Sequence, residues 1–173
     1  MKYATNKVSS ILMICVMAVA AAHCAKKKSV RYESPEELAR FVIERMHKGD
    51  SKAVIRSLVT KNEFIRDIYP YTEEAGSPGA LPGDDFWRIH MEWRRINAII
   101  QKTKDYRGKI VSFDGVGEPG RSITAGPYRF LQGIPLHLTV LDDYGAARKI
   151  TDDRFLGVVV QSGNAYMLLN VRK

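Results

Sequence analysis

The C-terminal third of the chain alternates apolar and polar residues with a period of two. Ile134, Leu136, Leu138 and Val140 occupy every second position, which is typical of a β-strand with one buried face. The run from Phe155 to Gln161 is apolar on both of its faces. This second pattern predicts a central strand that is covered on both sides.

Further strands are predicted on either side of these two. Ala165 to Val171 follows Ser162-Gly163-Asn164, a short glycine-containing link typical of a β-hairpin. Ile110 to Val116 and Tyr128 to Leu131 also have strand composition, and the turn Gly117-Glu118-Pro119-Gly120 lies between them. We therefore expect about five antiparallel strands.

Capping signals predict three short helices upstream of the sheet. Ser34-Pro35-Glu36-Glu37 combines an N-cap serine, a proline at the first helical position and a glutamate three residues after the cap. Gly49 is a typical helix stop. Asp50 can cap a second helix, and Thr60 can cap a third that must end before Pro70.

A long loop and a long helix are predicted between these helices and the sheet. Residues 70–85 contain three prolines and three glycines, which predicts a loop that is either a functional lid or a mobile insertion. Asp84 or Asp85 is then expected to cap a helix running to about Tyr106. Its expected buried stripe consists of Phe86, Ile89, Trp93, Ile96 and Ile100.

Helices followed by strands predict an α+β fold, with N-terminal helices packed on a curved antiparallel sheet. This order, with Ser34 to Phe41, Lys48-Gly49-Asp50 and the terminal run Ala165 to Val171, resembles the nuclear transport factor 2-like, or cystatin-like, α+β cone of small bacterial lipoproteins. The resemblance covers roughly residues 33–172. It implies a conical pocket between sheet and long helix, used in relatives for catalysis, for binding small apolar molecules or for protein contact.

The N-terminus has the pattern of an export signal. Lys2 and Lys7 precede an apolar run from Ile11 to Ala22, which is too short to span a bilayer stably. A basic start, a short apolar core and small residues predict a secretory signal peptide over residues 1–23. A buried first helix or a membrane anchor is the alternative interpretation.

Ala21-Ala22-His23-Cys24 resembles a bacterial lipobox, and the resemblance implies that Cys24 is diacylated and becomes the new N-terminus. The only other cysteine, Cys15, lies inside the signal, so the mature chain could form no intramolecular disulfide. Cleavage after Ala22 would instead leave Cys24 as a free thiol. We favour lipidation, because an unpaired exposed thiol is a liability in an exported protein and two acyl chains give stable anchoring.

The chain is therefore divided into a signal peptide (1–23), a tether (24–33) and a single α+β domain (34–173). The formal net charge of +8 falls to +6 without residues 1–23, which hold Lys2, Lys7 and no acid. Lys26-Lys27-Lys28 can contact anionic lipid headgroups, or can simply keep the tether soluble.

No metal-binding or nucleotide-binding motif is present, so we expect neither a metal nor a cofactor. His47, His90 and His137 form no pair at the spacing of a helical zinc site, and the mature chain offers them no cysteine partner. The glycines between Gly115 and Gly120 lack the lysine and the helix of a phosphate-binding loop.

Two constellations could still carry chemistry. Trp87, His90, Trp93, Tyr128 and His137 are the candidate pocket residues. If His90 and His137 converge, one of them could act as a general base beside an aromatic wall. In the simpler interpretation His90 lies at a rim and Trp93 in the core.

The second constellation is basic. The cationic side chains of the long helix and of the residues after it are interleaved with Trp87, as in polyanion-binding surfaces; they are Arg88, Arg94, Arg95, Lys102, Lys104, Arg107 and Lys109. The export signal argues against nucleic acid, and a solvated basic face is the simpler interpretation.

Together these patterns predict an exported cell-envelope protein, periplasmic or surface-facing, that is anchored to the membrane through lipidated Cys24. Its expected role is non-catalytic, by binding a small apolar ligand or an envelope protein. The alternative is a small pocket enzyme of the cyclase or isomerase type, with a histidine base.

Overall fold

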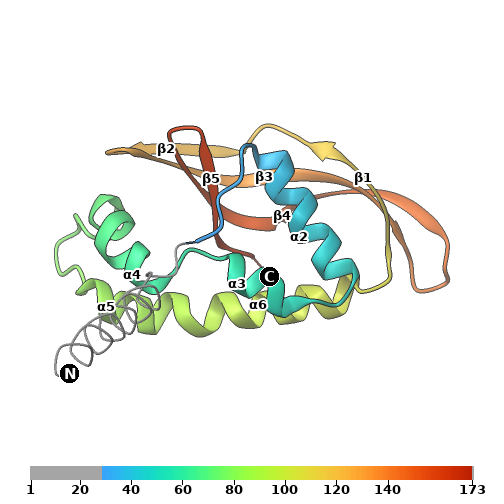
Figure 1. The fold of residues 1–173 in the computed structure, drawn as a ribbon, viewed down its shortest axis with the longest axis horizontal. Coiled ribbons are helices and arrows are strands. Elements are labelled where there is room, and N and C mark those ends of the chain that lie inside the picture. The colour runs from blue at the N-terminus through green and yellow to red at the C-terminus, as the bar shows by residue number, and fades with distance from the viewer. Residues whose placement is uncertain (1–28, 173) are drawn as a thin grey trace, which may run out of the picture.

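The computed structural model describes residues 29–172, and in it helices cover an antiparallel sheet (Figure 1). Helices α2 (Pro35–His47), α3 (Ser51–Ser57) and α4 (Lys61–Glu63) come first, and the strands follow. The predicted α+β class is thereby confirmed. The predicted signal peptide and the predicted lipidation site Cys24 lie outside the described residues. Within residues 29–172, no helix is both long enough and apolar enough to cross a membrane.

The short helices begin where the capping signals predict. The Ser34 hydroxyl accepts a hydrogen bond from the Glu37 backbone N–H at 3.0 Å, and the Glu37 carboxylate accepts one from the Glu33 N–H at 2.7 Å. Asp50 and Thr60 cap α3 and α4 through the same kind of bond. The α4 helix then continues into the π-helical turn η1 (Phe64–Ile68) and the 3-10 turn η2 (Tyr69–Tyr71).

The long helix consists of three consecutive segments, which Figure 1 shows as one rod along the sheet. They are α5 (Gly83–Phe86), the π-helical turn η3 (Trp87–Met91) and α6 (Glu92–Tyr106). The expected cap at Asp84 or Asp85 is wrong, because α5 already begins at Gly83 and its N-terminus has no side-chain cap.

The face that the long helix buries also differs from the predicted stripe. Ile89 is 47% exposed, Trp93 68% and Ile100 37%, whereas Arg95 and Lys102 are buried. Two causes account for the difference. The π-helical turn adds a residue to one helical turn and so rotates the helix that follows, and both buried cations find polar partners inside the protein.

The sheet is antiparallel, with the strand order β1-β3-β4-β5. The strands are β1 (Ile110–Val116), β2 (Arg121–Ala125), β3 (Tyr128–Leu141), β4 (Ala147–Ser162) and β5 (Ala165–Asn170). Strands β1 and β2 pair with successive stretches of the same edge of β3.

Three strand predictions need correction. Residues 128–131 and 134–141 form one strand, because Gly133 adopts a φ of 61° that only glycine reaches easily and the strand continues past it. Strand β4 begins at Ala147 and not at Phe155; its polar first half is held by pairing with β3. Strand β2 was not predicted, because Arg121–Ala125 contains only one large apolar residue.

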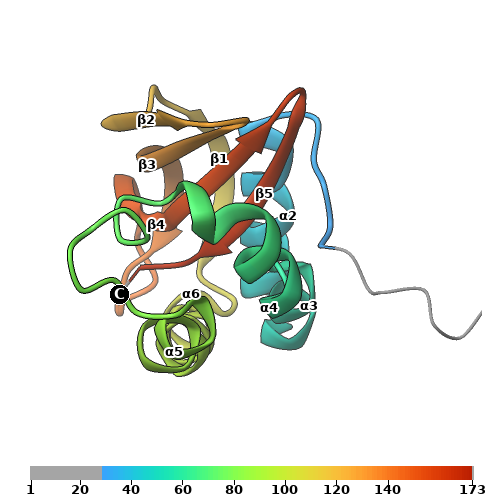
Figure 2. The ribbon, with the colours of Figure 1, turned by 90° about the vertical axis from the view of Figure 1, so that its left-hand side faces the viewer.

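Both faces of the sheet are covered near β5. Neighbouring residues of a strand point to opposite faces, so Leu131, Val159 and Leu168 pack against α2. Phe130, Val160, Met167 and Leu169 pack instead against η1 and η3. Figure 2 looks along the long helix and shows it beneath the sheet with α2 to its right, and α2 and α6 also contact each other.

The outer edge of β5 is closed by segments from far earlier in the chain. Tyr32 and Tyr166 exchange backbone hydrogen bonds of 2.9 and 2.8 Å, and the Val59 N–H donates to the Leu168 carbonyl at 2.9 Å. An unpaired strand edge is a site for association with other chains, so these contacts protect the sheet.

Arg95 completes this closure from the long helix. Its guanidinium donates to the carbonyl oxygens of Val59 at 2.9 Å and Leu169 at 3.2 Å, and lies 4.1 Å from the centre of the Trp87 ring. Burial lowers the pKa of Arg95 to about 10, so the side chain remains charged at neutral pH. Among the described residues it forms no ion pair, and the carbonyls and the ring solvate the charge.

We expect Arg95→Leu to lower the free energy of unfolding by about 3 kcal/mol, because two buried carbonyls lose a charged donor. Urea and thermal unfolding measure this loss. Arg94→Leu is the matched control, since Arg94 is the exposed neighbour on the same helix, and its effect should stay within about 0.5 kcal/mol. Equal losses in the two variants would contradict the assigned role of Arg95.

Candidate functional site

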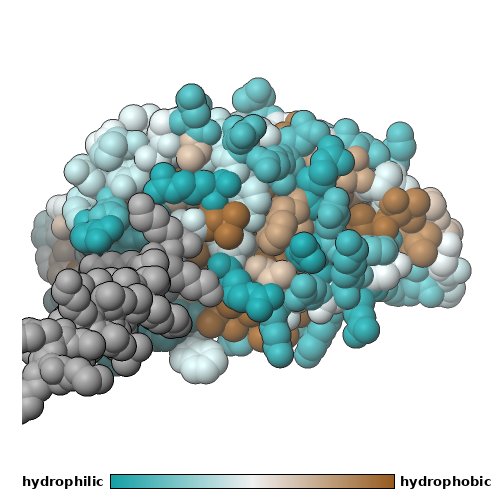
Figure 3. Space-filling model, in the orientation of Figure 1, coloured by the Kyte–Doolittle hydropathy of each residue, from teal (hydrophilic) through white to brown (hydrophobic). Residues whose placement is uncertain are grey.

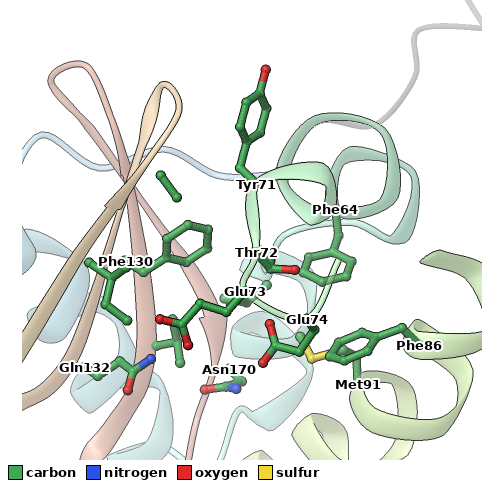
Figure 4. Close-up of a pocket in the computed structure, with 14 residues that line it drawn as sticks. Phe64, Tyr71, Thr72, Glu73, Glu74, Phe86, Met91, Phe130, Gln132 and Asn170 are labelled. Atoms are coloured by element: carbon green, nitrogen blue, oxygen red, sulfur yellow. The ribbon is translucent and has the colours of Figure 1, made fainter. Parts of the chain in front are cut away.

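A cavity of about 160 Å³ lies between the sheet and the segment Tyr71–Glu74 (Figure 4). We call it the loop pocket. Strands β3, β4 and β5 supply its floor through Phe130, Val158 and Leu169, whose side chains share one face of the sheet. The helical segments supply its wall through Phe64, Phe86 and Met91. The pocket is open to solvent and is not an enclosed void.

Aromatic contacts hold the wall in place before any ligand binds. The Phe64 ring lies 6.1 Å from the Phe86 ring and 5.3 Å from the Trp87 ring, measured between centres. Phe64 is 1% exposed and Met91 8%, so the core fixes their positions. A pre-formed apolar surface of this kind is typical of small-molecule sites.

The loop above the pocket is fixed to the β2–β3 hairpin. The Tyr71 ring lies against Gly126, where any Cβ atom would overlap it, and its centre is 5.7 Å from that of Tyr128. Glu73 forms an ion pair with Arg121 of β2 at 3.3 Å. Glycine is therefore required at position 126 both for its φ of 57° and for the space that the Tyr71 ring occupies.

The far end of the same loop is closed by a single hydrogen bond. The Tyr69 hydroxyl donates to the Leu81 carbonyl, which joins the two ends of the proline- and glycine-rich segment. Of the loop that the sequence predicts between residues 70 and 85, the first part, Tyr71–Glu74, lines the pocket; ordered loops of this kind often carry function.

Acceptor groups surround the mouth of the pocket. Figure 4 shows the carboxylates of Glu73 and Glu74 directed towards its interior, above Gln132 and Asn170. Glu73 is partly neutralised by Arg121, whereas Glu74 forms no ion pair within residues 29–172. The site thus combines an apolar interior with negative charge at its entrance.

The floor includes one amide with an unsatisfied acceptor. The Oδ1 atom of Asn170 is buried and accepts no hydrogen bond from the described residues. It lies over Gly157, where a Cβ atom would overlap it, so glycine at this position makes room for the amide. A buried acceptor without a partner is costly, and a ligand donor that reached it would relieve the cost.

The lining residues are mostly apolar, and their titratable groups are Tyr71, Glu73 and Glu74. They include no histidine, cysteine, serine or lysine. Within residues 29–172, no group of three or more side chains could hold a metal ion.

The structure does not bring the five predicted pocket residues together. His90 lines a different groove, with Arg94 and Asn97, and its ring centre is 4.9 Å from that of Phe86. His137 is exposed on β3 and contacts Thr151 at 3.2 Å. Neither histidine lines the loop pocket.

The three aromatic candidates also lie apart. Trp87 is buried beneath Arg95, and Trp93 is exposed to solvent. Tyr128 lies beside the loop pocket against Tyr71; burial, followed by the charges of Asp67 and Glu63, raises the pKa of its phenol. Of the five, Tyr128 contacts the loop at Tyr71, while Trp87 and His90 contact the wall residues Phe64 and Phe86 from outside the pocket.

Sequence reasoning missed Tyr71, Glu73 and Glu74, although it identified the loop that contains them. The available signal was an aromatic residue and two adjacent acids at the start of a segment otherwise rich in proline, glycine and small residues. What could not be read from the sequence is the docking of Tyr71 on Gly126, a contact across more than fifty positions of the chain.

A second polar cluster lies between α6 and the opposite face of the sheet. The Asp152 carboxylate accepts hydrogen bonds from Lys102 Nζ and from the Tyr106 hydroxyl, both at 2.9 Å. The Phe155 ring covers the cluster, with its centre 5.1 Å from both Lys102 Nζ and the centre of the Tyr106 ring. The side chains of Lys102 and Asp152 are only 10% and 15% exposed, so the cluster is largely shielded from solvent.

The Asp152 carboxylate is held in its charged form. Burial alone would raise its pKa, but the hydrogen bond and charge of Lys102, the Arg154 N–H and the Tyr106 hydroxyl together keep the pKa below its usual value. Burial and the charge of Asp152 in turn raise the pKa of Tyr106, so its hydroxyl remains a donor. We interpret the cluster as a structural ion pair between helix and sheet.

Comparisons with protein-family models, with curated proteins and with solved structures give no match to this chain.

We expect Asp152→Asn to lower the free energy of unfolding by about 3 kcal/mol at pH 7, because Lys102 is left buried without its partner. The lowered pKa means that the ion pair stabilises the protein above about pH 4 and is lost as the pH falls further. The difference between wild type and variant should therefore shrink below pH 4 in urea unfolding. Asp153→Asn, at the exposed neighbouring position, is the control; a pH-independent difference for Asp152→Asn would contradict this assignment.

Proposed function

We propose that this protein is an exported, lipid-anchored cell-envelope protein whose domain binds a small apolar molecule with a positively charged end. The observation that carries the proposal is the loop pocket, an apolar cavity with Glu73 and Glu74 at its mouth. The role is binding without catalysis, and it requires neither a metal nor a cofactor.

The size of the cavity limits the apolar part of the ligand. About 160 Å³ is comparable to cavities that hold one benzene-sized molecule. Phe130, Phe64 and Phe86 offer aromatic surfaces on two sides of this space. A single aromatic ring or a short branched hydrocarbon therefore fits the interior, and because the pocket is open to solvent, a second fused ring can extend into its mouth.

Charge selects the polar part of the ligand. An ammonium group at the mouth would lie near the Glu74 carboxylate, whereas a carboxylate there would be repelled by both acids. The contribution is modest, because both glutamates are exposed and surface ion pairs contribute about 1 kcal/mol or less. The apolar interior supplies most of the affinity and the acids supply selectivity.

The envelope location is supported by the sequence alone. The apolar run from Ile11 to Ala22, the lipobox-like segment before Cys24 and the basic residues after it favour export with lipidation. The alternative of an enzyme with a histidine base receives no support from the geometry. Neither His90 nor His137 lines the loop pocket; His90 lines the groove beside Arg94, whereas His137 contacts Thr151 on the sheet.

Three indole compounds whose 3-position carries a cationic group, no group or an anionic group test the ligand chemistry by titration calorimetry. Tryptamine, which is cationic, should bind most tightly, followed by indole and then by indole-3-acetate. Glu74→Gln should weaken tryptamine binding about threefold and leave indole binding unchanged, because only the amine interacts with the carboxylate. Preference for the acetate would overturn the proposed selectivity.

A pocket-filling variant tests the location of binding. Ala125→Phe places a ring in the cavity that Ala125 lines, and it should abolish binding of tryptamine and indole alike. Ala147→Phe is the control. Ala147 is exposed at the start of β4, whereas the pocket residue of that strand, Val158, lies near its other end. If Ala125→Phe binds as wild type does, the pocket is not the site.

The anchor is tested separately by the mass of the mature N-terminus from native membranes. We expect a diacylglyceryl group on Cys24 and loss of membrane association in Cys24→Ala. A soluble exported protein with its N-terminus at His23 would exclude the anchor and would leave the pocket proposal intact.

A further inference from the structure

The long helix carries an apolar stripe on its solvent side. Ile89, Trp93, Ile96 and Ile100 follow one another at helical spacing; Ile89, Trp93 and Ile100 are exposed and Ile96 is half-buried. We call these four residues the outer stripe. Figure 3 shows apolar patches among the polar atoms along the lower edge of the molecule, where Figure 1 places this helix.

The outer stripe is not needed for the core. The helix packs inward through a different set of residues, which includes Met91, Arg95 and Ile99. Single exposed apolar residues are ordinary on protein surfaces, but a contiguous stripe that includes a tryptophan marks an interaction surface.

A cationic groove runs beside the outer stripe. This open depression of about 470 Å³ is lined by His90, Arg94 and Asn97 of the helix and by the segment Asn170 to Arg172 at the end of the sheet. Arg94 and Arg172 are exposed, and neither forms an ion pair with any residue in the described part of the chain. We call it the flanking groove; its free charges suit an anionic group.

We infer that the outer stripe and the flanking groove together form the surface with which this protein lies on an anionic phospholipid bilayer. Trp93 and the isoleucines would enter the boundary between headgroups and acyl chains, where tryptophan is favoured. Arg94 and Arg172 would contact the lipid phosphates. Apolar insertion beside unpaired cations matches the chemistry of such a membrane better than that of a neutral protein partner.

The predicted anchor at Cys24 places the start of the long helix near the bilayer, and to that extent the inference rests on the proposed function. Ser29, at the start of the described chain, donates to Glu63 at 3.2 Å, and Lys61 on the same helix pairs with Asp84 at the start of the long helix at 2.8 Å. Cys24 precedes Ser29 by five residues. Such a segment spans at most about 17 Å, so the start of the long helix stays close to an anchored Cys24.

The test uses the mature chain, residues 24–173, with Cys24→Ser, so that no acyl group contributes to binding. This chain keeps every described helix and strand, and circular dichroism verifies its fold. Cosedimentation with vesicles of phosphatidylglycerol should show binding that weakens with salt, and vesicles of phosphatidylcholine should bind far less.

Tryptophan fluorescence identifies the face that touches the lipid. The chain has two tryptophans, and Trp87 is buried at 3% exposure, so quenching by brominated phosphatidylglycerol should report Trp93. The quenching should disappear in Trp93→Phe. Quenching that persists in this variant would overturn the assignment of the face.

Variants of the two elements separate their contributions. Ile89→Ser with Ile100→Ser should weaken vesicle binding at least tenfold, because apolar insertion is lost. Arg94→Gln with Arg172→Gln should weaken it about twenty-five-fold, because each cation contributes about fivefold. Val111→Ser and Lys149→Gln, exposed positions on β1 and β4, are the matched controls and should bind as the parent chain does.

Three outcomes would overturn the inference. The first is vesicle binding that the stripe variants leave unchanged. The second is a dimer, seen by sedimentation velocity, that Trp93→Ser dissociates, since the stripe would then bind a second copy. The third is competition by free glycerol phosphate at the concentration of the lipid phosphate, which would indicate a site for a soluble anion.

Tryptamine binding in the same variants shows whether the loop pocket remains intact, so failure of the surface is distinguishable from failure of the proposed function.

Discussion

One guanidinium group fixes the geometry of this protein. Arg95 lies where the long helix passes the end of β5, and it binds one carbonyl of that strand and one carbonyl of the segment after α3. Two buried carbonyls and the Trp87 ring replace the water that the charge would otherwise hold. Because a planar donor group with two acceptors tolerates little rotation, the orientation of the helix around its own axis follows from this contact.

The positions of the loop pocket and of the Asp152 cluster follow from that orientation of the long helix. With Arg95 turned inward, Met91 reaches the loop pocket on one face of the sheet, while Lys102 reaches Asp152 on the other face. Strand β2 lines the pocket with Ile123 and Ala125, and Gly126 lets Tyr71 hold the loop against the hairpin. The cluster around Asp152 is closed because Phe155 and Tyr106 fill the remaining space. The same helix therefore helps to form a binding cavity and a structural ion pair.

The sequence predicted those features that depend on neighbours in the chain. The caps at Ser34, Asp50 and Thr60 involve bonds over three residues, and the hairpin at Gly163 needs only its own backbone conformation. The start of β4 could not be predicted, because its polar residues are held by β3 and not by their own preference for strands. The loop was identified by its prolines and glycines, but its function as a cap depends on long-range contacts of Tyr71 and Glu73. His90 and His137 were chosen by residue type, and only the fold shows that they are separate.

The long helix shows why amphipathic periodicity alone can select the wrong face. A hydrophobic stripe predicts burial only when the polar residues on the opposite face of the helix find no hydrogen-bond partners in the protein interior. Here Arg95 and Lys102 gain buried acceptors, and the π-helical turn between Trp87 and Met91 shifts the register of the residues that follow. The helix therefore has two faces suited to burial, and the core of this chain uses the one that contains the cations. The other face remains apolar although the fold does not require it, and this is the physical reason for assigning it to a surface outside the protein.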